Sequence, residues 1–254
     1  MSRPLILITN DDGFFAKGLL TLIELVKEFG DVVVVAPDKP QSAMSNAISL
    51  NKPLRYVFQK NEGNVAYYSC NGTPVDCTKL AFNVILDRKP DLLVSGINHG
   101  SNSSINVIYS GTMAAAMEGA LKGVPSIGFS LLDHDLDANF DVCNGVVKTI
   151  IEKVLDKGMI KGCCLNVNIP KVDPDEIKGI RVCRQANANW EEEFNERVDL
   201  SGVKYYWLTG KFKNYDNLED TDEWALANSY VSIVPVQYDL TNYAAKQDIE
   251  NWGL

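Results

Sequence analysis

The hydrophobic residues near the N-terminus form two different patterns, first a continuous run and then a helical repeat. The run at residues 5–9 ends in the turn-forming string Asn10-Asp11-Asp12-Gly13, which predicts a buried strand that opens into a loop. From residue 19 to 29 the apolar residues recur at roughly helical spacing, and Gly30 closes this helix. Residues 32–36 are a second buried strand. A strand, a helix and a strand in succession predict a parallel sheet with helices on its faces.

The same alternation of strand and helix patterns continues along the chain. Thr73-Pro74 is typical of a helix start, and Gly123 follows a helix that is rich in small residues. We therefore predict an α/β fold, in which residues 1–178 form a Rossmann-like catalytic core with a doubly wound, mostly parallel sheet. The further elements predicted in this core are helices at 74–86, 112–122 and 142–155 and strands at 92–95 and 126–130.

The character of the sequence changes after about residue 179. Polar and aromatic residues replace the apolar runs, and a β-like stretch at 230–236 lies near the end. Residues 179–254 are therefore predicted to form a β-rich segment that packs on the core. From residue 221 onward apolar and aromatic side chains show only weak helical periodicity. So much apolar surface must cover the chain's own core or be buried against a second copy.

The acidic balance of the chain excludes some classes of partner. A net charge of -9 over 254 residues argues against broad binding to nucleic-acid duplexes or membranes, because such binding uses many Lys and Arg residues. A small phosphorylated ligand is compatible with this charge, since a bound cation reverses its sign locally. No apolar run reaches the length of a membrane span, and the N-terminal residues lack a signal-peptide cleavage pattern. We therefore expect a cytoplasmic protein with six reduced cysteines.

Three of the predicted strands end in polar loops, which is where ligands bind in an open parallel sheet. Asp11 and Asp12 follow the first strand, Ser42 lies in the loop after the second, and Asn98 follows the strand at 92–95. Two adjacent carboxylates repel each other unless a cation or a basic group neutralises them. The oxygen ligands suit Mg²⁺, Mn²⁺ or Ca²⁺ better than zinc. We predict a divalent-cation site here, and the alternative is a simple polar turn.

A second candidate site is the start of the helix at 112–122. A helix N-terminus offers unpaired N–H groups and the positive end of a dipole, and a glycine permits close approach of an anion to the backbone. Ser110, Gly111 and Thr112 are therefore predicted to bind a phosphate group. The alternative is that Ser110 or Thr112 only caps the helix.

Several other catalytic classes lack their motifs in this chain. His99 and His134 are the only histidines, which argues against a His-rich zinc site and against most Ser-His-Asp arrangements. His99 lies in a loop suited to an acid or a phosphate donor, although a structural role is the alternative. No GxSxG, GxGxxG or Walker A string is present. A haloacid-dehalogenase-like phosphatase uses a second Asp two positions after its nucleophile, whereas Asp11 and Asp12 are adjacent.

These loops together resemble the SurE family, the survival proteins with 5′/3′-nucleotidase activity. The resemblance spans nearly the whole chain, with the motifs in the order of the family. The motifs that carry it are Ile8-Thr9-Asn10-Asp11-Asp12-Gly13, Ala36-Pro37 with Gln41-Ser42, Asn71-Gly72-Thr73-Pro74 with Asp76-Cys77, Ser95-Gly96-Ile97-Asn98 with Gly100 and Asn102, Tyr109-Ser110-Gly111-Thr112 with Glu118-Gly119, Tyr205-Tyr206-Trp207-Leu208, Thr221-Asp222 and Tyr230-Val231-Ser232.

The resemblance implies a phosphatase that hydrolyses nucleoside monophosphates to nucleoside and phosphate. It implies one divalent cation per subunit, Mg²⁺ or Mn²⁺ and in crystals also Ca²⁺, and a dimer or tetramer formed through the C-terminal segment. The metal ligands would be Asp11, Asp12, Ser42 and Asn98, the phosphate contacts Asn10, Asn102, Ser110, Gly111 and Thr112, and the catalytic residues Asp11, Asp12 and Asn102.

The sequence departs from the family pattern at two positions next to the predicted metal site. Lys17 stands where the family usually has Pro, and Ala43 follows Ser42 where a Gly is common. Both positions shape loops at the opening of the site, so they bear on the substrate range. An alternative function from another class is a regulatory protein that binds metal and nucleotide without turnover.

Overall fold

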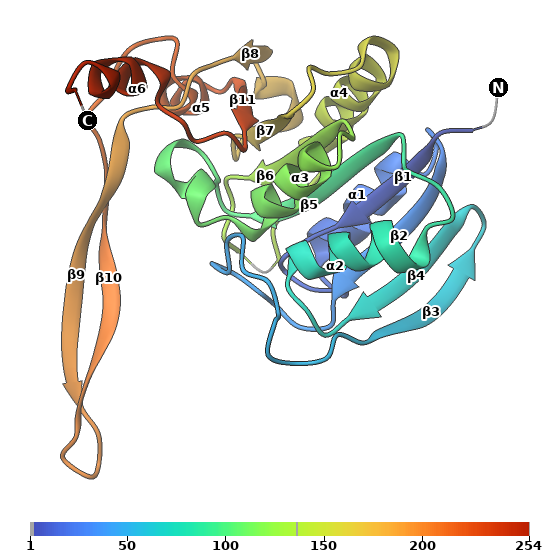
Figure 1. Ribbon diagram of the computed structural model, residues 1–254, viewed down its shortest axis with the longest axis horizontal. Coiled ribbons are helices and arrows are strands. Elements are labelled where there is room, and N and C mark those ends of the chain that lie inside the picture. Colours follow the sequence, from blue (N-terminus) through green and yellow to red (C-terminus); the bar gives the residue numbers. More distant parts are fainter. Residues whose placement is uncertain (1–2, 136, 254) are drawn as a thin grey trace.

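The computed structural model describes residues 3–135 and 137–253, and its centre is a nine-stranded, mostly parallel sheet (Figure 1). The strand order is β3-β4-β2-β1-β5-β6-β7-β11-β8. Strand β1 pairs in parallel with β2 on one side and with β5 on the other, so the order of strands reverses beside β1. The predicted α/β fold with a mostly parallel sheet is confirmed. The strands of this sheet are β1 (Leu5–Thr9), β2 (Asp31–Pro37), β3 (Tyr56–Glu62), β4 (Val65–Cys70), β5 (Leu92–His99), β6 (Ser126–Leu131), β7 (Cys163–Ile169), β8 (Ile180–Val182) and β11 (Val231–Gln237).

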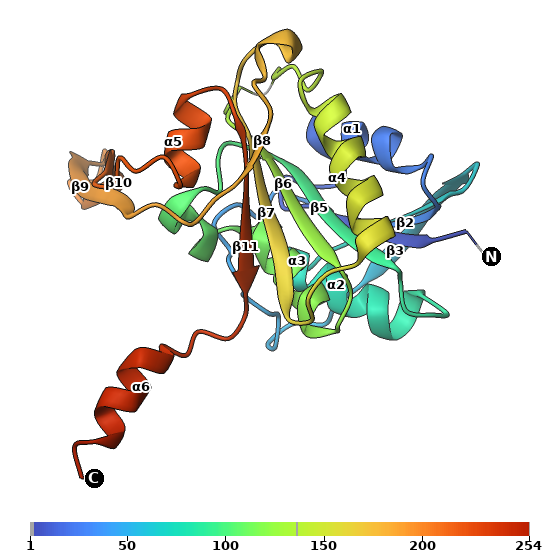
Figure 2. The same ribbon diagram turned by 90° about the horizontal axis from the view of Figure 1, so that it is seen from above.

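Helices cover both faces of the sheet, α1 and α4 on one face and α2 and α3 on the other (Figure 2). The continuous apolar run of β1 packs against the helices on both faces of the sheet, because successive side chains of a strand point to opposite faces. Ile6 and Ile8 are buried in the core beside α1 and α4, whereas Leu7 is buried with Cys77 of α2. The helices are α1 (Lys17–Val26), α2 (Pro74–Leu80), α3 (Gly111–Leu121), α4 (Cys143–Lys157), α5 (Asp222–Ala227) and α6 (Tyr243–Glu250).

Each helix and strand predicted for the first two-thirds of the chain is present. Helix α2 is a regular α-helix to Leu80 and continues as a π-helical turn over Ala81–Ile85, which brings it to the predicted end. Strands β3, β4 and β7 were not predicted. Strand β3 is exposed along its whole length, and β7 carries two buried polar residues, Asn166 and Asn168, so neither shows the apolar run of an interior strand.

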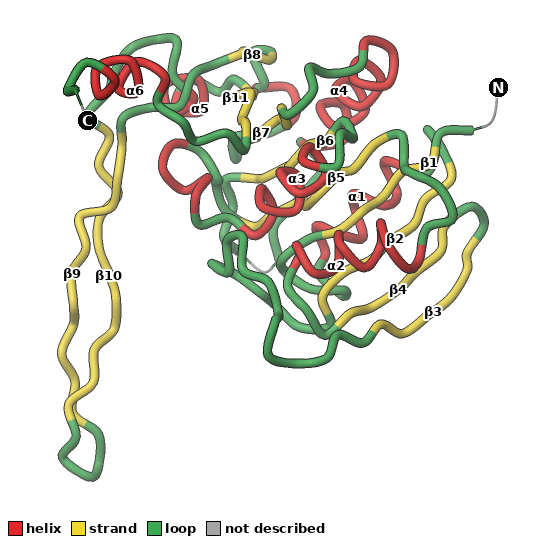
Figure 3. Tube along the Cα trace, in the orientation of Figure 1, coloured by secondary structure: helices red, strands yellow, loops and turns green. Residues whose placement is uncertain are grey.

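The last third of the chain divides between the main sheet and two projecting segments. Strands β8 and β11 belong to the main sheet, which therefore crosses the boundary expected at residue 178. Strands β9 (Ala188–Val198) and β10 (Lys204–Asn214) form a separate antiparallel hairpin arm that extends far from the sheet (Figure 3). Helix α6 also projects outward and has no buried residue (Figure 2).

The apolar residues after residue 221 fall into two groups, one buried and one exposed. Ala225, Val231 and Val234 are buried in the chain's own core, while Tyr243, Ile249 and Trp252 are exposed. In the part of the chain that the structure describes, no helix is both long enough and apolar enough to cross a bilayer.

Candidate functional site

The carboxyl ends of β1 and β5 open onto a cavity of 580 Å³ at the point where strand order reverses. Ligands of open α/β sheets bind at such a point. Six candidate residues line the cavity, and the other three, Asn10, Gly111 and Thr112, lie outside its lining. The six are Asp11, Asp12, Ser42, Asn98, Asn102 and Ser110.

Asp11 is almost fully buried and is held on two sides. The Thr112 hydroxyl donates to its Oδ1 (2.5 Å), and the Gln41 N–H donates to its backbone carbonyl (2.7 Å). Burial, and to a smaller extent the charge of Asp12, raises the pKa of Asp11 to about 6, while the Thr112 hydrogen bond acts in the opposite direction. Among the described residues, no lysine or arginine balances the negative charge of the Asp11 carboxylate.

Asp12 is half-buried and points toward the end of β5. The backbone N–H of His99 donates to its Oδ2 (3.2 Å). Burial raises the pKa of Asp12, against the lowering effect of this hydrogen bond. Among the described residues no lysine or arginine contributes to the pKa of either carboxylate.

His99 lines the same cavity as the acidic pair, and two contacts hold its side chain. Its Nδ1 lies 2.9 Å from the carbonyl oxygen of Asp135, and its ring meets that of Phe140 edge-on, with the centroids 5.1 Å apart. These contacts support a structural role for the His99 side chain, and the backbone N–H of His99 donates to Asp12.

Asn98, near the end of β5, and Ser42, in the loop after β2, line the same cavity as the acidic pair. Asn98 donates one amide hydrogen to the carbonyl of Gly100 (2.8 Å), so this bond uses neither its side-chain oxygen nor its second amide hydrogen. Ser42 is exposed, and the next residue, Ala43, has a φ of 59°. This left-handed region favours glycine, so the departure from the family pattern at Ala43 falls at a position where glycine fits best.

The start of α3 is occupied by contacts within the protein. Ser110 caps the helix, because its Oγ accepts the N–H of Met113 (3.0 Å). Gly111 packs against the side chain of Asp11, and Thr112 is fully buried with its hydroxyl on the same residue. Of these three residues, Ser110 lines the cavity, whereas Gly111 and Thr112 lie outside its lining and contact the side chain of Asp11.

Asn102 is held in a network of buried polar groups that sequence reasoning missed. Its backbone N–H donates to Asn168 Oδ1 (2.8 Å), its side-chain amide donates to Ser130 Oγ (2.8 Å), and its carbonyl accepts the amide of Asn166 (2.8 Å). Asn166 and Asn168 alternate with apolar residues on β7, and this pattern was the available signal. The network fixes both the backbone and the side chain of Asn102.

The base of the hairpin arm forms a further wall of the cavity, which the sequence did not predict. Trp190 of β9 and Phe212 of β10 are cross-strand partners with ring centroids 5.6 Å apart, and both line the cavity. Glu223 also lines it and accepts a hydrogen bond from the Ser103 hydroxyl. Burial raises the pKa of Glu223.

Asp222 fastens this wall to the loop that carries Asn102. Its carboxylate accepts the N–H groups of Ser104 (2.7 Å) and Ala186 (2.9 Å). Two carboxylates shortly before Asp222 in the chain are held by an arginine, because Arg184 forms ion pairs with Asp216 and Asp220.

The ligand set around the acidic pair fits a hard divalent cation. Among the described residues no group of three or more His, Cys, Asp or Glu side chains could hold a metal, which argues against zinc and leaves the two carboxylates with amide and hydroxyl oxygens. The Asn10 Oδ1 atom is buried next to the pair without a hydrogen-bond partner among the described atoms. A bound cation relieves the repulsion between the two carboxylates.

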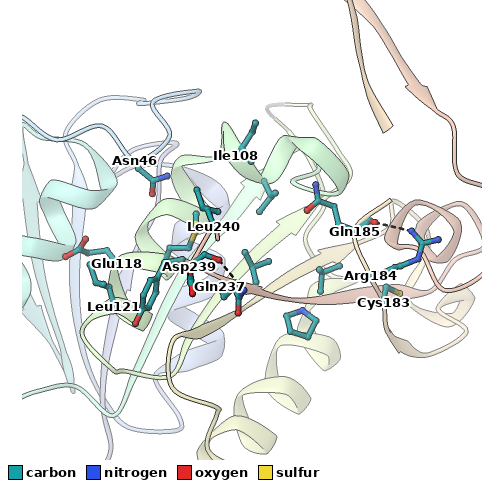
Figure 4. Close-up of a pocket in the computed structure, with 16 residues that line it drawn as sticks. Asn46, Ile108, Glu118, Leu121, Cys183, Arg184, Gln185, Gln237, Asp239 and Leu240 are labelled. Carbon is teal, nitrogen blue, oxygen red and sulfur yellow. Dashed lines mark hydrogen bonds between the residues drawn. The ribbon is translucent and has the colours of Figure 1, made fainter. Parts of the chain in front are cut away.

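A larger cavity of 1010 Å³ lies between α3 and β11 and contains none of the candidate residues. Figure 4 shows Ile108, Leu121 and Leu240 around it, and its lining is mostly apolar. We assign the chemistry to the smaller cavity, because it holds the adjacent carboxylates of Asp11 and Asp12 at the strand-order reversal, together with the other candidate side chains.

Comparison with known proteins gives one consistent family. Residues 6–192 match the family model described as survival protein SurE. The chain is 56% identical to the 5′-nucleotidase SurE of Flavobacterium psychrophilum, over 100% of this chain and 99% of that protein. It is 58% identical to the 5′-nucleotidase SurE of Christiangramia forsetii, over 99% and 98%. The crystal structure of the SurE protein from Aquifex aeolicus covers 99% of this chain and 100% of its own, with 39% identity and a TM-score of 0.85.

Proposed function

The chain belongs to the SurE family, and we propose that it is a 5′-nucleotidase that hydrolyses nucleoside monophosphates to nucleoside and phosphate. The observation that carries the proposal is the pair Asp11 and Asp12, buried or half-buried at the strand-order reversal with no lysine or arginine partner among the described residues. Such a pair is poised for a divalent cation. No observation favours binding without turnover.

We assign the cation, Mg²⁺ or Mn²⁺, to Asp11, Asp12, Ser42 and Asn98, all of which line one cavity. When bound, a divalent cation supplies Lewis-acid stabilisation of the charge on the phosphoryl group. Asp11 is the more rigid ligand, because Thr112 and Gln41 fix its side chain and its backbone. Asp12 is the more accessible of the two and is the candidate to accept a proton from the attacking water.

Two neighbouring side chains are suited to bind the phosphoryl oxygens. Ser110 Oγ accepts the helix-capping hydrogen bond, so its own O–H proton is left to donate into the cavity. Asn102 uses one of its two amide hydrogens on Ser130 and keeps the other for a ligand. Both side chains are almost fully buried, which strengthens hydrogen bonds to a charged ligand. Gly111 and Thr112 act indirectly, through Asp11, and Asn10 supports the same loop by donating to the carbonyl of Gly13 (2.9 Å).

The hydrolysis requires these groups to act together on one phosphate ester. A water oxygen forms the new bond to phosphorus, the P–O bond to the ribose oxygen breaks, and the ribose oxygen takes up a proton. Ser110 and Asn102 hold the phosphoryl oxygens where charge develops, and each such donor is worth roughly 3 kcal/mol of barrier reduction.

We also propose that the protein self-associates through its two projecting segments. Phe194, Trp207 and Leu208 on the hairpin arm are each more than 60% exposed. Helix α6 has no buried residue, although Tyr243 and Trp252 lie on it or beside it. Apolar surface of this extent is typical of an interface, and a closed two-fold dimer is the commonest arrangement.

The proposed function is tested by phosphate release from adenosine 5′-monophosphate, adenosine 3′-monophosphate and ribose 5-phosphate, with Mg²⁺ or Mn²⁺ and with a chelator. We expect cation-dependent release from the nucleotides. Tight nucleotide binding without release under all these conditions would establish the regulatory alternative.

A further inference from the structure

One wall of the catalytic cavity is aromatic and comes from the hairpin arm, not from the sheet. Trp190 and Phe212 line the same 580 Å³ cavity as Asp11, Asp12 and Ser110. Phosphate and cation chemistry gives no reason for two aromatic rings there, because the proposed ligands of both are oxygen or N–H groups. This wall therefore calls for a different part of the substrate.

The indole of Trp190 is fixed in place although it is 44% exposed. Its Nε1 donates to Asn106 Oδ1 (2.8 Å), and the Phe212 ring packs against it at an interplanar angle of 63°. A tryptophan that only covers a core is normally buried, whereas this one is held on its edge and leaves ring surface open to the cavity. A fixed, open aromatic face is suited to stacking on a planar ligand group, at little cost in side-chain entropy.

A carboxylate that lines the same cavity suits the rest of a nucleoside. Glu223 lines the cavity and is oriented by the Ser103 hydroxyl, so its second oxygen is left as an acceptor. An acceptor carboxylate matches ribose hydroxyls or an exocyclic amino group. A cavity of this volume also falls in the range that encloses a ligand of nucleotide size.

We propose that Trp190 stacks on the nucleobase of the substrate, with Phe212 supporting the indole, so that the root of the hairpin arm selects nucleotides over other phosphate monoesters. This inference rests on the proposed nucleotidase function and adds a residue that sets its substrate class. Stacking on a base contributes uniform binding energy, because the base is not part of the reacting centre.

The test compares adenosine 5′-monophosphate with ribose 5-phosphate, which has the same phosphate and sugar but no base. Trp190→Ala should lower kcat/KM for the nucleotide by about tenfold to a hundredfold, mainly through KM, and change kcat/KM for ribose 5-phosphate by less than about twofold. Trp190→Phe should recover most of the loss. Phe58→Ala is the matched control, because Phe58 is an exposed aromatic residue of β3 that belongs neither to the lining of this cavity nor to the two projecting segments.

Equal losses on both substrates, or no loss on either, would overturn the stacking role. If the wild-type protein releases phosphate from neither substrate, the proposed function fails by itself. In that case equilibrium dialysis of adenosine 5′-monophosphate still decides the inference, because Trp190→Ala must then weaken nucleotide binding at least tenfold relative to wild type. Circular dichroism and light scattering on each variant identify any loss that comes from unfolding or dissociation.

Discussion

Gly111 packs so closely against Asp11 that a β-carbon at position 111 would lie 2.8 Å from the Asp11 β-carbon and 3.0 Å from its Oδ2. This contact gives the glycine a packing role, beside the approach of an anion to the helix start for which it was selected in the sequence. The glycine leaves room for the carboxylate that we assign to the metal.

Gly111→Ala is therefore expected to displace the Asp11 carboxylate and lower kcat/KM for nucleotide hydrolysis at least tenfold, with weaker cation binding. Gly145→Ala is the matched control, because Gly145 lies inside α4 and a β-carbon added there would meet nothing within 4 Å. This control should keep full activity and gain up to about 1 kcal/mol of stability from the better helix propensity of alanine. Steady-state kinetics with chemical denaturation measures both, and normal activity of Gly111→Ala would refute the positional argument.

Asp11→Asn should lower turnover by at least two orders of magnitude while the fold is kept. The asparagine oxygen can still accept from Thr112, whereas the buried charge next to Asp12 is removed. In the absence of cations we therefore expect the variant to unfold at the same temperature as wild type or higher. Near-normal phosphate release by this variant in Mg²⁺ or Mn²⁺ would contradict the metal assignment.

Addition of Mn²⁺ or Mg²⁺ should raise the unfolding temperature of the wild-type protein, because a ligand that binds only the folded state stabilises it. At a cation concentration of 100 times the Kd the gain is about 2.7 kcal/mol. Asp12→Asn should lose most of this gain, and a chelator should stop phosphate release until cation is restored. An equal thermal shift in wild type and Asp12→Asn would place the cation elsewhere.

Acid should weaken the attachment of the hairpin arm through the ion pair between Arg184 and Asp216, whose nitrogen and oxygen atoms lie 2.5 Å apart. The Arg184 guanidinium lowers the pKa of Asp216 to about 2. A carboxyl with a depressed folded pKa contributes stability above its ordinary pKa of about 3.9, and this contribution is lost as pH falls toward 2.

Asp216→Asn should accordingly be less stable than wild type at neutral pH and lose less stability between pH 4 and pH 2. Denaturant titrations at several pH values measure this difference. Asp156→Asn removes an exposed carboxylate that forms an ion pair with the adjacent Lys157, and this variant should behave like wild type. Parallel pH profiles for wild type and Asp216→Asn would exclude the ion pair as the cause.

A chain that ends after Gln237 keeps β11 and lacks α6. We expect this truncation to shift the protein toward monomer in light scattering, because it removes Tyr243, Ile249 and Trp252 and leaves the buried part of the tail intact. A monodisperse monomer for the full-length chain at micromolar concentration would instead show that the exposed tail has no partner copy.

The sequence predicted the parts of the site that follow strands along the chain. Asp11, Asp12, Ser42 and Asn98 were selected because each follows a predicted strand, and all four line one cavity. Asn98 lies inside β5, because this strand continues to His99, beyond the end predicted at residue 95. Trp190, Phe212 and Glu223 reach the same cavity from the last third of the chain. Nothing local in the sequence shows where a hairpin arm attaches, since that depends on contacts such as Asp222 with Ser104.

Prediction of the fold was likewise limited by contacts between residues far apart in the sequence. The regular apolar patterns of β1, α1 and β2 carry enough information to define a strand, a helix and a strand. Strand β7 was missed because Asn166 and Asn168 interrupt its apolar pattern. Both can be buried because Asn102 donates to Asn168 and accepts from Asn166. Their polar side chains are satisfied by these hydrogen bonds in the folded protein, but in the sequence alone they argue against a buried strand.

The position of β11 between β7 and β8 has a consequence for the protein as it leaves the ribosome. Strand β8 ends at Val182, yet its only neighbour in the described sheet begins at Val231. At roughly 5–20 residues per second, translation of the intervening residues takes several seconds, during which β8 has no strand to join. The cavity, whose lining extends from Asp11 to Glu223, is likewise incomplete until nearly the whole chain has been made. The wall that we assign to the nucleoside is therefore completed late in biosynthesis, after the residues that form the acidic pair.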